Sequence, residues 1–372
     1  MPIRNRSTDA CPGVLTVHQA ADGGVARIRV PGGQLPAAAF RVVVAAAAEL
    51  GDGHIELTSR ANLQVRGLAP GAETVLGGRL AGAGLLPSAS HELVRNILAS
   101  PLTGRDSVAD VRPVVADLDA ALRAAPDLAA LPGRFLFAVD DGRGDVAWLG
   151  ADVAALRLDE HTAAILLGGV DSGLRVSPLS AAELMLACAK AFLEVRDGEW
   201  RVAELATRSD LVARVGDAVA APLPSRMPVA VGPLGRVAQV DGRVSLVAGA
   251  PLGRLDQDQA AALTGADLVV TPWRSVVVAD LPPDRVEPLA NRLRVTGLLL
   301  DPDAPRVTAC VGRPGCAKAL ADVRADAARL PSPDPTVPVH WSGCERRCGR
   351  PRGEVIDVVA TGHGYTSTRG VS

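Results

Sequence analysis

The chain has 372 residues, more than one hydrophobic core usually serves, so the sequence predicts at least two domains. Apolar residues make up 48% and charged residues 22%, an ordinary globular balance that excludes a disordered chain. A formal net charge of −2, with 2% aromatic residues, argues against a protein that binds nucleic acid or a membrane surface.

The N-terminal residues 1–9 are polar and contain no apolar run of the secretory type. The longest apolar run, residues 42–48, is far shorter than the roughly 20 residues that a membrane-spanning helix needs. We therefore expect a cytoplasmic protein.

An internal repeat relates the two halves of the chain. Residues 55–68 (IELTSRANLQVRGL) match residues 268–281 (LVVTPWRSVVVADL), with Thr58 and Thr271 both in fourth place and apolar residues at matching alternate places. The same offset of 213 relates residues 84–86 to 297–299, and Pro101 to Pro314. Upstream, residues 30–35 (VPGGQL) echo residues 247–252 (VAGAPL). Chance similarity between Ala/Val/Leu-rich segments is the alternative to a duplication.

Each copy has the pattern of a ferredoxin-like unit. Apolar residues alternate with period two at 55–57 and 63–65, as in half-buried strands, whereas residues 36–50 and 286–295 have the spacing of amphipathic helices. The resulting order, strand–helix–strand–strand–helix, is the ferredoxin-like arrangement. Two copies predict an α+β fold in which the halves form one pseudo-symmetric sheet domain.

The remaining segments divide the chain further. Ser180 and Glu183 have the spacing of a capping box at the start of a helix through residue 195, and residues 222–233 (PLPSRMPVAVGP) have the composition of a linker. We expect half-domains at residues 1–105 and 223–300, a first lobe at residues 106–222 and a cysteine-bearing C-terminal lobe at residues 301–372.

Four of the six cysteines lie in two late pairs, and their spacing is C-x5-C, 27 residues, then C-x3-C. Four thiolates from two separated pairs suit a 4Fe–4S cluster, with one thiolate on each iron. A structural zinc is the alternative, but zinc pairs usually have two to four intervening residues. Glycines beside the cysteines would let backbone N–H groups approach sulfur, and a helix at residues 317–330 should follow. The predicted ligands are Cys310, Cys316, Cys344 and Cys348.

The combined motifs resemble the siroheme-dependent nitrite and sulfite reductases. The cysteine pairs with GC…CGRP resemble their cluster signature, LTSRANLQVRG (57–67) resembles their half-domain motif, and VRNILASPLTG (94–104) resembles the segment that follows it. In that family each ferredoxin-like half-domain is followed by an α/β lobe. The resemblance implies this fold for nearly the whole chain.

In that family the last cysteine joins the cluster to the siroheme iron, and its place here is Cys348. Arginines and lysines hold the tetrapyrrole carboxylates and a small anionic substrate; two of the family's arginines fall on Arg60 and Arg95. A basic motif, LPRKFK, falls on LPGRFLF (131–137), where Arg134 and Leu136 replace its lysines. The apolar Leu136 argues against reduction of nitrite or sulfite.

The segment LPGRFLFAVDDGRGD (131–145) is more similar to the precorrin-3B synthase family, which keeps the scaffold and the cluster. This resemblance implies an oxidoreductase that uses dioxygen to hydroxylate precorrin-3A and close a lactone. A mononuclear non-haem iron is associated with that family. A separate electron-donor protein is implied because the sequence has neither a dinucleotide-binding glycine motif nor a P-loop. A siroheme-dependent reductase is the alternative, and a non-catalytic zinc-binding module a more distant one.

Several side chains are candidates for binding the tetrapyrrole, because a guanidinium pairs bidentately with a carboxylate. They are Arg60, Arg66, Arg95, Asn96, Arg134, Arg274 and Arg313. No catalytic residue is assigned. As ligands of a non-haem iron, the positions to test are His91, Glu92 and His340. The run that holds Asp140, Asp141 and Asp145 is typical first of a turn.

Overall fold

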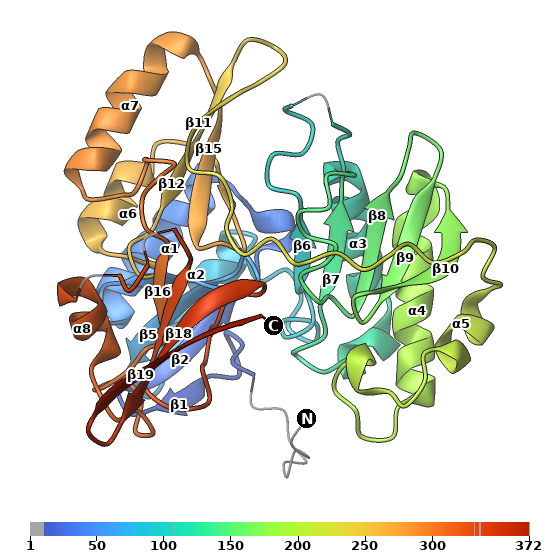
Figure 1. The fold of residues 1–372 in the computed structure, drawn as a ribbon, viewed down its shortest axis with the longest axis horizontal. Coiled ribbons are helices and arrows are strands. Elements are labelled where there is room, and N and C mark those ends of the chain that lie inside the picture. The colour runs from blue at the N-terminus through green and yellow to red at the C-terminus, as the bar shows by residue number, and fades with distance from the viewer. Residues whose placement is uncertain (1–10, 107, 331, 335, 372) are drawn as a thin grey trace.

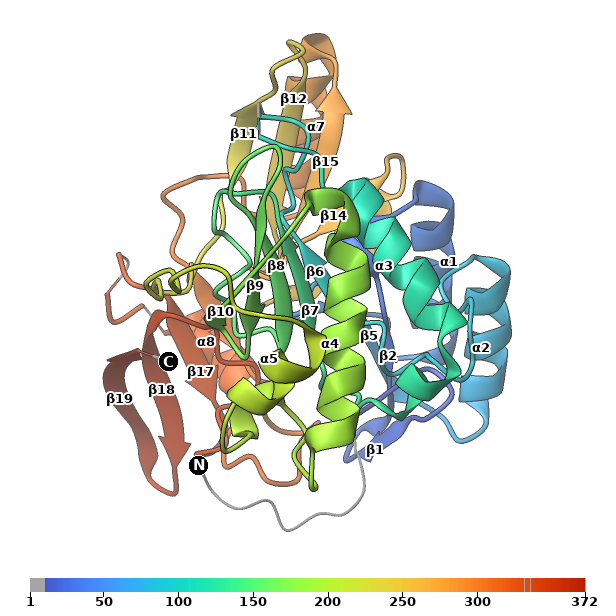
Figure 2. The ribbon, with the colours of Figure 1, turned by 90° about the vertical axis from the view of Figure 1, so that its right-hand side faces the viewer.

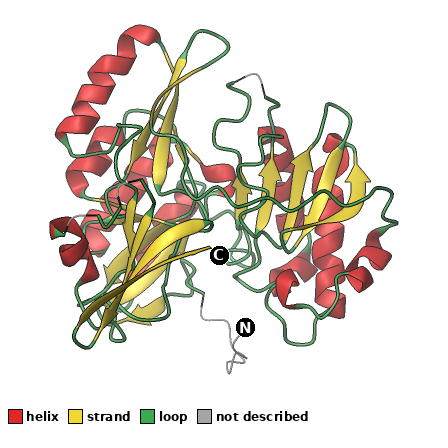
Figure 3. Ribbon diagram, in the orientation of Figure 1, coloured by secondary structure: helices red, strands yellow, loops and turns green. Residues whose placement is uncertain are grey.

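The structure is a computed structural model that describes residues 11–106, 108–330, 332–334 and 336–371. Two half-domains and the cysteine lobe lie together, and the first α/β lobe stands beside them (Figures 1 and 3). The polar residues 1–9 lie outside the described residues. In the described part of the chain, no helix combines the length and the apolar character that crossing a bilayer requires.

The two half-domains contain the same elements in the same order, which confirms the predicted duplicated α+β fold. The first contains β1 (His18–Ala20), β2 (Gly23–Ile28), β3 (Gln34–Leu35), α1 (Ala37–Leu50), β4 (Ile55–Leu57), β5 (Leu63–Leu68) and α2 (Ala72–Gly82). The second contains β11 (Gly235–Ala238), β12 (Val244–Gly249), β13 (Arg254–Leu255), α6 (Gln257–Leu263), β14 (Leu268–Val270), β15 (Ser275–Leu281) and α7 (Pro283–Val295).

The half-domains exchange one short strand. The first sheet has the order β1-β2-β5-β4-β13 and the second the order β11-β12-β15-β14-β3, so each sheet ends on a strand from the other copy. Leu255 of β13 pairs with Ile55, and Leu35 of β3 pairs with Leu268. The two copies are therefore interlocked.

The backbone repeats as closely as the strand order. Ala61 and Arg274, 213 residues apart, both take the left-handed conformation that side chains usually avoid, with φ of 53° and 56°. At the head of each turn, the Thr58 and Thr271 hydroxyls accept backbone N–H groups two and four residues on. The turns are equivalent because the same side-chain hydrogen bonds close them.

The upstream part of the repeat aligns differently from the prediction. Because β3 and β13 occupy equivalent places, Leu35 corresponds to Leu255, and residues 30–35 match residues 250–255 (APLGRL) rather than 247–252. The offset there is 220, since the chain between β13 and β14 is seven residues shorter. Gly33 and Gly253 both have positive φ, 72° and 78°, which agrees with this alignment.

One apolar core joins the two half-domains. It packs α1, α2, α6 and α7 against the inner faces of both sheets, through residues such as Leu63 and Val65 of β5 and Val276 and Val278 of β15. These positions are two apart in each strand, as a sheet with one buried face requires. The polar alternate positions of β5 lie on the opposite face.

The two lobes also share a topology. The first contains β6 (Ile97–Ala99), α3 (Arg112–Ala124), β7 (Phe137–Asp140), β8 (Val153–Arg157), β9 (Ala163–Leu167), β10 (Val170–Val176), α4 (Ala181–Val195) and α5 (Ser209–Val215); the second contains β16 (Val307–Ala309), α8 (Val323–Arg329), β17 (Val339–Ser342), β18 (Glu354–Thr361) and β19 (Gly364–Val371). In both, three parallel strands are followed by an antiparallel one. Because β6 pairs with β7, the first lobe's sheet begins at Ile97, ahead of the expected boundary at residue 105.

Helices α3 and α4 lie together along one face of the first lobe's sheet (Figure 2). Helix α4 begins after Ser180, as the sequence predicts, but no side-chain capping bond forms there. A complete capping box instead starts α6, between Asp256 and Gln259. Cys188 of α4 is fully buried, and burial raises the pKa of its thiol to about 12, which agrees with a role in packing.

Two expected features differ in the structure: the helix after the first cysteine pair and the linker. The predicted helix at residues 317–330 is short: α8 begins at Val323, because Asp322 caps it by accepting the Ala325 N–H. Leu320 and Leu330, which helical spacing would place on one face with Val323, are each nearly half exposed. The linker runs without helix or strand from residue 216 to 234, a longer span than the predicted 222–233. It crosses from α5 of the first lobe to β11 of the second half-domain (Figure 1).

Candidate functional site

The four late cysteines lie on two neighbouring loops. Cys310 and Cys316 follow β16, and Cys344 and Cys348 follow β17, the strand that pairs with β16 in parallel. The carboxyl ends of parallel strands meet at one edge of a sheet, which is why residues so far apart in sequence come together here. All four thiols are free; Cys348 is exposed, and the others are half-buried.

Glycines allow these loops to pack closely. A Cβ atom on Gly343 would lie 2.6 Å from the Cβ of Ala319, and one on Gly312 would lie 2.8 Å from a methyl group of Val323. Gly312 also has a positive φ of 67°. Both positions exclude larger residues, so glycine sets the distance between the loops.

The electrostatics of the sulfurs reflect their proximity. The pKa of Cys310 is raised, first by burial and then by the neighbouring thiolates of Cys348 and Cys344; the Gly343 N–H, 3.2 Å from Cys310 Sγ, opposes this. The pKa of Cys348 is raised chiefly by burial, and Cys344 and Cys316 add to it. A bound metal centre would relieve this repulsion, since it holds all four as thiolates.

A zinc ion and a four-iron cluster differ in the sulfur spacing that they impose on four cysteines. Tetrahedral zinc would bring the sulfurs to about 3.8 Å from one another. Among the described residues, no three of these cysteines have sulfurs that all lie within 4.8 Å of one another. A four-iron cubane places each thiolate on a separate iron, so its sulfurs stand farther apart. The two loops thus bring together four thiolate donors, the number that either metal centre takes.

A cavity of about 280 Å³ adjoins the second cysteine loop. The turns at residues 59–60 and 272–273, which the repeat makes equivalent, both line it, so it lies between the two copies. Five arginines and no carboxylate are among its lining residues. These residues are Ser59, Arg60, Leu136, Leu149, Gly150, Arg201, Val229, Ala230, Pro272, Trp273, Arg347, Gly349, Arg350, Pro351 and Arg352. We call this space the arginine cavity.

Arginines near this cavity are buried without full pairing. Burial, then the charges of Arg201 and Arg27, lower the pKa of Arg60 to about 9. Burial also lowers the pKa of Arg29 to about 9. In the described structure, neither Arg29 Nη1 nor Arg27 Nε has a hydrogen-bond partner. Buried, unpaired cations of one sign are costly, so this region is suited to an anionic ligand.

Three of the predicted tetrapyrrole ligands instead support the cysteine loops. Arg66 pairs with Asp22 at 2.8 Å and donates to the Gly315 carbonyl at 3.2 Å. Arg274 donates to the Gly349 carbonyl, next to Cys348. Arg313 donates to the Ala319 carbonyl within its own loop at 2.7 Å.

The other candidate residues differ in whether they lie near the cavity and Cys348. Arg60 lines the cavity, and the exposed Arg134 is close enough to Cys348 to lower the pKa of that thiol. Arg95 forms a buried bidentate pair with Asp119 and is not among the cavity residues. Asn96 is fully buried; it accepts from Asn62 and donates to the carbonyls of Leu93, Gly133 and Phe135.

The sequence analysis missed four cavity arginines. Arg347, Arg350 and Arg352 flank Cys348 in sequence, and their place in CERRCGRPRG was a usable signal. Arg201 had no local signal, because it is positioned by Asp152, far away in sequence, whose carboxylate accepts its Nε at 2.6 Å. Asp152 also accepts the backbone N–H groups of Leu136 and Val202.

The residues singled out as iron ligands have structural partners. His91 bonds Ser88, Ser90 and the Ala125 carbonyl, and the Glu92 carboxylate accepts the backbone N–H groups of residues 14–16. His340 lies between Thr308 and the Cys348 carbonyl; burial and then Arg274 lower its pKa to about 3, so it stays neutral.

One carboxylate oxygen from each of Asp140, Asp141 and Asp145 lies within 4.8 Å of the others, at the carboxyl end of β7. The Asp140 carboxylate accepts four backbone N–H groups from residues 142–147, which closes the predicted turn. Asp141 pairs with Arg143, and Asp145 accepts from Ser100. The group has the contacts of a structural turn.

The chain is similar in sequence to known proteins. A family model described as the nitrite/sulfite reductase ferredoxin-like half domain matches residues 18–74. A curated precorrin-3B synthase from Sinorhizobium sp is 27% identical over 96% of this chain and 81% of its own length. A ferredoxin–nitrite reductase from Synechococcus elongatus is 27% identical over 90% of this chain and 75% of its own.

Among solved structures, the NirA protein of Mycobacterium tuberculosis superposes with a TM-score of 0.72 at 22% identity, covering 93% of this chain and 73% of that one. At this identity the match establishes the fold. With the other comparisons it confirms the resemblance seen in the motifs: the chain is similar over most of its length to a precorrin-3B synthase and to a nitrite reductase, and one segment matches the half-domain of the nitrite/sulfite reductases.

Proposed function

We propose that this protein is an oxygen-dependent oxidoreductase that converts precorrin-3A to precorrin-3B in aerobic cobalamin biosynthesis. In this reaction one atom of dioxygen enters the product, which also closes a lactone. The other atom leaves as water, with two electrons and two protons supplied by a reductant. We further propose a cytoplasmic location and a separate electron-donor protein, without nucleic-acid or membrane partners.

The observation that carries the proposal is the arginine cavity beside the cysteine loops. Precorrin-3A is a tetrapyrrole with eight carboxylates, and a lining of five arginines without a carboxylate complements such an anion. Arg60, at the β4–β5 turn, and Arg201, held by Asp152, would pair with carboxylates from different sides. The Arg60 guanidinium, which pairs with no carboxylate in the described structure, would then gain an anionic partner.

The residues around the cavity would have different roles: metal ligands, loop supports and cavity walls. Cys310, Cys316, Cys344 and Cys348 would hold a 4Fe–4S cluster, which supplies one-electron transfer when bound. Arg274 and His340 hold the carbonyls of Gly349 and Cys348, so they fix the second loop against the cavity. Leu149 and Trp273 give the cavity apolar wall for a macrocycle, while the arginines orient its rim.

A siroheme-dependent nitrite or sulfite reductase is the second candidate, because the same cavity suits siroheme carboxylates and one relative is a nitrite reductase. Leu136 weighs against it. This buried side chain lines the cavity and carries no charge for a small anion. The zinc-binding module is disfavoured by the five residues between Cys310 and Cys316, a wide gap for a zinc pair.

The experiment is anaerobic purification of the whole chain, followed by counting of iron and acid-labile sulfide. We expect about four of each per chain, and iron beyond four would mark a mononuclear iron. Precorrin-3A, dioxygen and a reducing system should then yield a hydroxylated lactone, detected by mass spectrometry. Siroheme absorption in the purified protein would instead establish the reductase, and colourless protein with one zinc and no sulfide would establish the zinc module.

Replacing one ligand gives the matched control. Cys316→Ser should lose most of the iron and sulfide, whereas Cys188→Ser, a cysteine in the packed core, should keep both despite lower stability. Equal cluster content in these two variants would contradict the assigned ligands.

A further inference from the structure

The outer faces of the two half-domain sheets differ in chemistry. Strand pairing places β2 against β5 in the first copy and β12 against β15 in the second, so each outward position has a counterpart. In the first copy these positions are charged or polar; in the second they are apolar or lack a side chain. The pairs are Arg27 and Val247, Arg29 and Gly249, Glu56 and Val269, Gln64 and Val277, and Arg66 and Ala279.

A pocket of about 130 Å³ lies over the apolar face. Val247 and Val277 form its floor, and linker residues 229 and 231–233 contribute to its wall. We call it the valine pocket. Its lining residues are Pro101, Leu102, Arg143, Asp145, Val229, Val231, Gly232, Pro233, Val247, Thr271, Trp273, Ser275 and Val277.

The polar groups of this pocket are satisfied elsewhere. Thr271 and Ser275 bond each other at 2.7 Å. Arg143 pairs with Asp106 and Asp141, and Asp145 accepts from Ser100 at 2.6 Å. With its polar atoms paired and valines, prolines and a leucine around it, the pocket has little to offer a polar ligand. An apolar protein cavity of about 150 Å³ is known to stay dry and to bind xenon.

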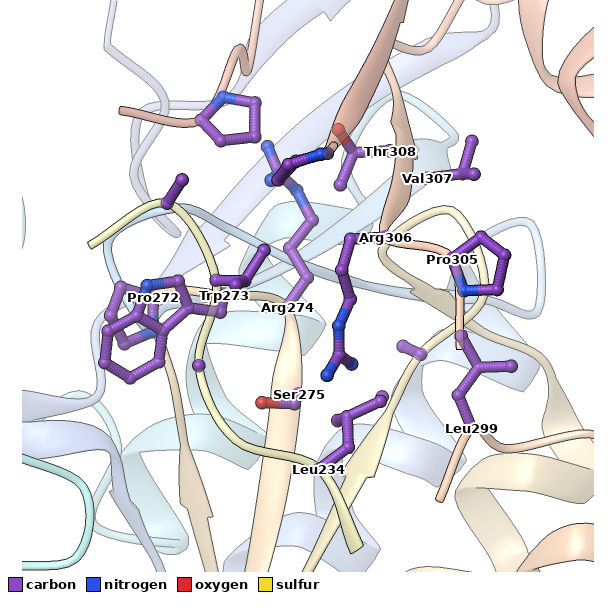
Figure 4. Close-up of a pocket in the computed structure, with 17 residues that line it drawn as sticks. Leu234, Pro272, Trp273, Arg274, Ser275, Leu299, Pro305, Arg306, Val307 and Thr308 are labelled. Atoms are coloured by element: carbon purple, nitrogen blue, oxygen red, sulfur yellow. The ribbon is translucent and has the colours of Figure 1, made fainter. Parts of the chain in front are cut away.

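The valine pocket and the arginine cavity share a wall. Trp273 and Val229 line both, and the Trp273 indole N–H donates to the Val229 carbonyl at 2.8 Å. The indole also packs on Gly232, where a Cβ would lie 2.4 Å from the ring. Figure 4 shows Trp273 and Arg274 leaving the same turn in different directions around a third, smaller pocket. One aromatic side chain therefore separates the two spaces.

We propose that the valine pocket binds a small apolar gas, dioxygen, and delivers it past Trp273 into the arginine cavity. The proposal rests on the oxygen-dependent function proposed above. Dioxygen is apolar and uncharged, so it partitions from water into the valine pocket, whereas the carboxylated substrate is held by the arginines. The valine pocket and the arginine cavity would thus bind the two co-substrates on opposite chemical terms.

The direct test is xenon binding to crystals of the full chain under pressure, since xenon occupies apolar gas sites. We expect density in the valine pocket, and none there in Val277→Phe or in Val231→Phe, whose side chain is on the linker and 37% exposed in the wild type. Val240→Phe, the same change at a residue 67% exposed and outside the pocket, is the control.

The functional readout is the oxygen dependence of product formation. Both filled variants should raise the KM for dioxygen at least threefold and leave the Kd for precorrin-3A unchanged, and Val240→Phe should change neither. Wild-type crystals without xenon in the pocket, or folded filled variants with the wild-type oxygen KM, would overturn the delivery proposal alone. Xenon binding in a protein that forms no oxygen-dependent product would overturn the proposed function and the dioxygen assignment together.

Discussion

Burial and pairing together decide what each arginine of this protein can do. Arg95 is buried, and its Nε and Nη2 donate to the two carboxylate oxygens of Asp119, so it stabilises the first lobe. Arg60 is half-buried and pairs with no carboxylate among the described residues, so its charge is costly in the free protein and is available to a ligand. The sequence motifs that point to both residues cannot distinguish these roles, because pairing depends on distant residues.

Arg60→Met tests this difference. Methionine fills similar space without a charge to desolvate, so the free protein should be as stable as the wild type or about 1 kcal/mol more stable. Affinity for precorrin-3A should fall about 10-fold or more, the loss of one charge-assisted hydrogen bond. Thermal unfolding and a binding titration give the two measurements.

Arg95→Met is the matched comparison. Removing this arginine leaves Asp119 with Arg123 as its remaining partner, so stability should fall by about 1–3 kcal/mol while tetrapyrrole affinity changes little. A weaker tetrapyrrole Kd in Arg95→Met than in Arg60→Met would contradict the division between the two arginines.

Asp145 should make stability depend on pH. Burial and then the charge of Asp140 raise the pKa of its carboxyl from 3.8 to about 7, which Ser100 only partly opposes. Because the folded form holds this proton more tightly than the unfolded chain, its contribution to stability declines as pH rises from about 4 to 7. Asp145→Asn removes the charge, so it should raise stability by about 1–3 kcal/mol at pH 8 and change it little at pH 4. Chemical denaturation at the two pH values checks this; an equal effect at both would contradict it.

The cysteine loops show what sequence spacing can and cannot predict about an element. The cysteine pairs predicted the two loops that the structure brings together, because the proposed ligands lie on two short segments. The helix after them was predicted to start six residues too early. Leu320 followed the apolar spacing, but its backbone N–H bonds the Gly343 carbonyl of the other loop, so tertiary contact replaces the first helical turn.

Gly343→Ala should disturb both loops. The added methyl would lie 2.6 Å from Ala319, so the loop must shift and carry its cysteines with it. We expect less iron and sulfide per chain and a loss of about 1–3 kcal/mol in stability. Gly265→Ala, where a Cβ meets nothing within 4 Å, is the control. Wild-type cluster content in Gly343→Ala would contradict this account of the loops.

At the scale of the whole molecule, the sequence predicted the duplication but missed the strand exchange. Alternating apolar residues identified β4, β5, β14 and β15, because these strands bury one face. Strands β3 and β13 have two residues each, too few for a period, and nothing local specifies that they pair with the other copy.

The exchange predicts that the halves cannot fold separately. A fragment of residues 1–222 lacks the strand that completes its sheet and leaves half of the shared core exposed. Expressed alone, it and residues 223–372 should show no cooperative unfolding, and mixed they should form a 1:1 complex with the far-UV spectrum of the whole chain. The cut between residues 222 and 223 lies in the linker, so it interrupts no helix or strand. Cooperative unfolding of either fragment alone would refute the prediction.

The interlocked sheets have a consequence for symmetry. A chain with a single copy of this unit could close its sheet only by borrowing a strand from an identical chain, so its stable form would be a homodimer. Every substitution in such a dimer appears twice, and its two outer faces must stay alike. Fusing the copies into one chain removes that constraint. One face became basic and the other aliphatic, a difference that no symmetric pair of identical chains can encode.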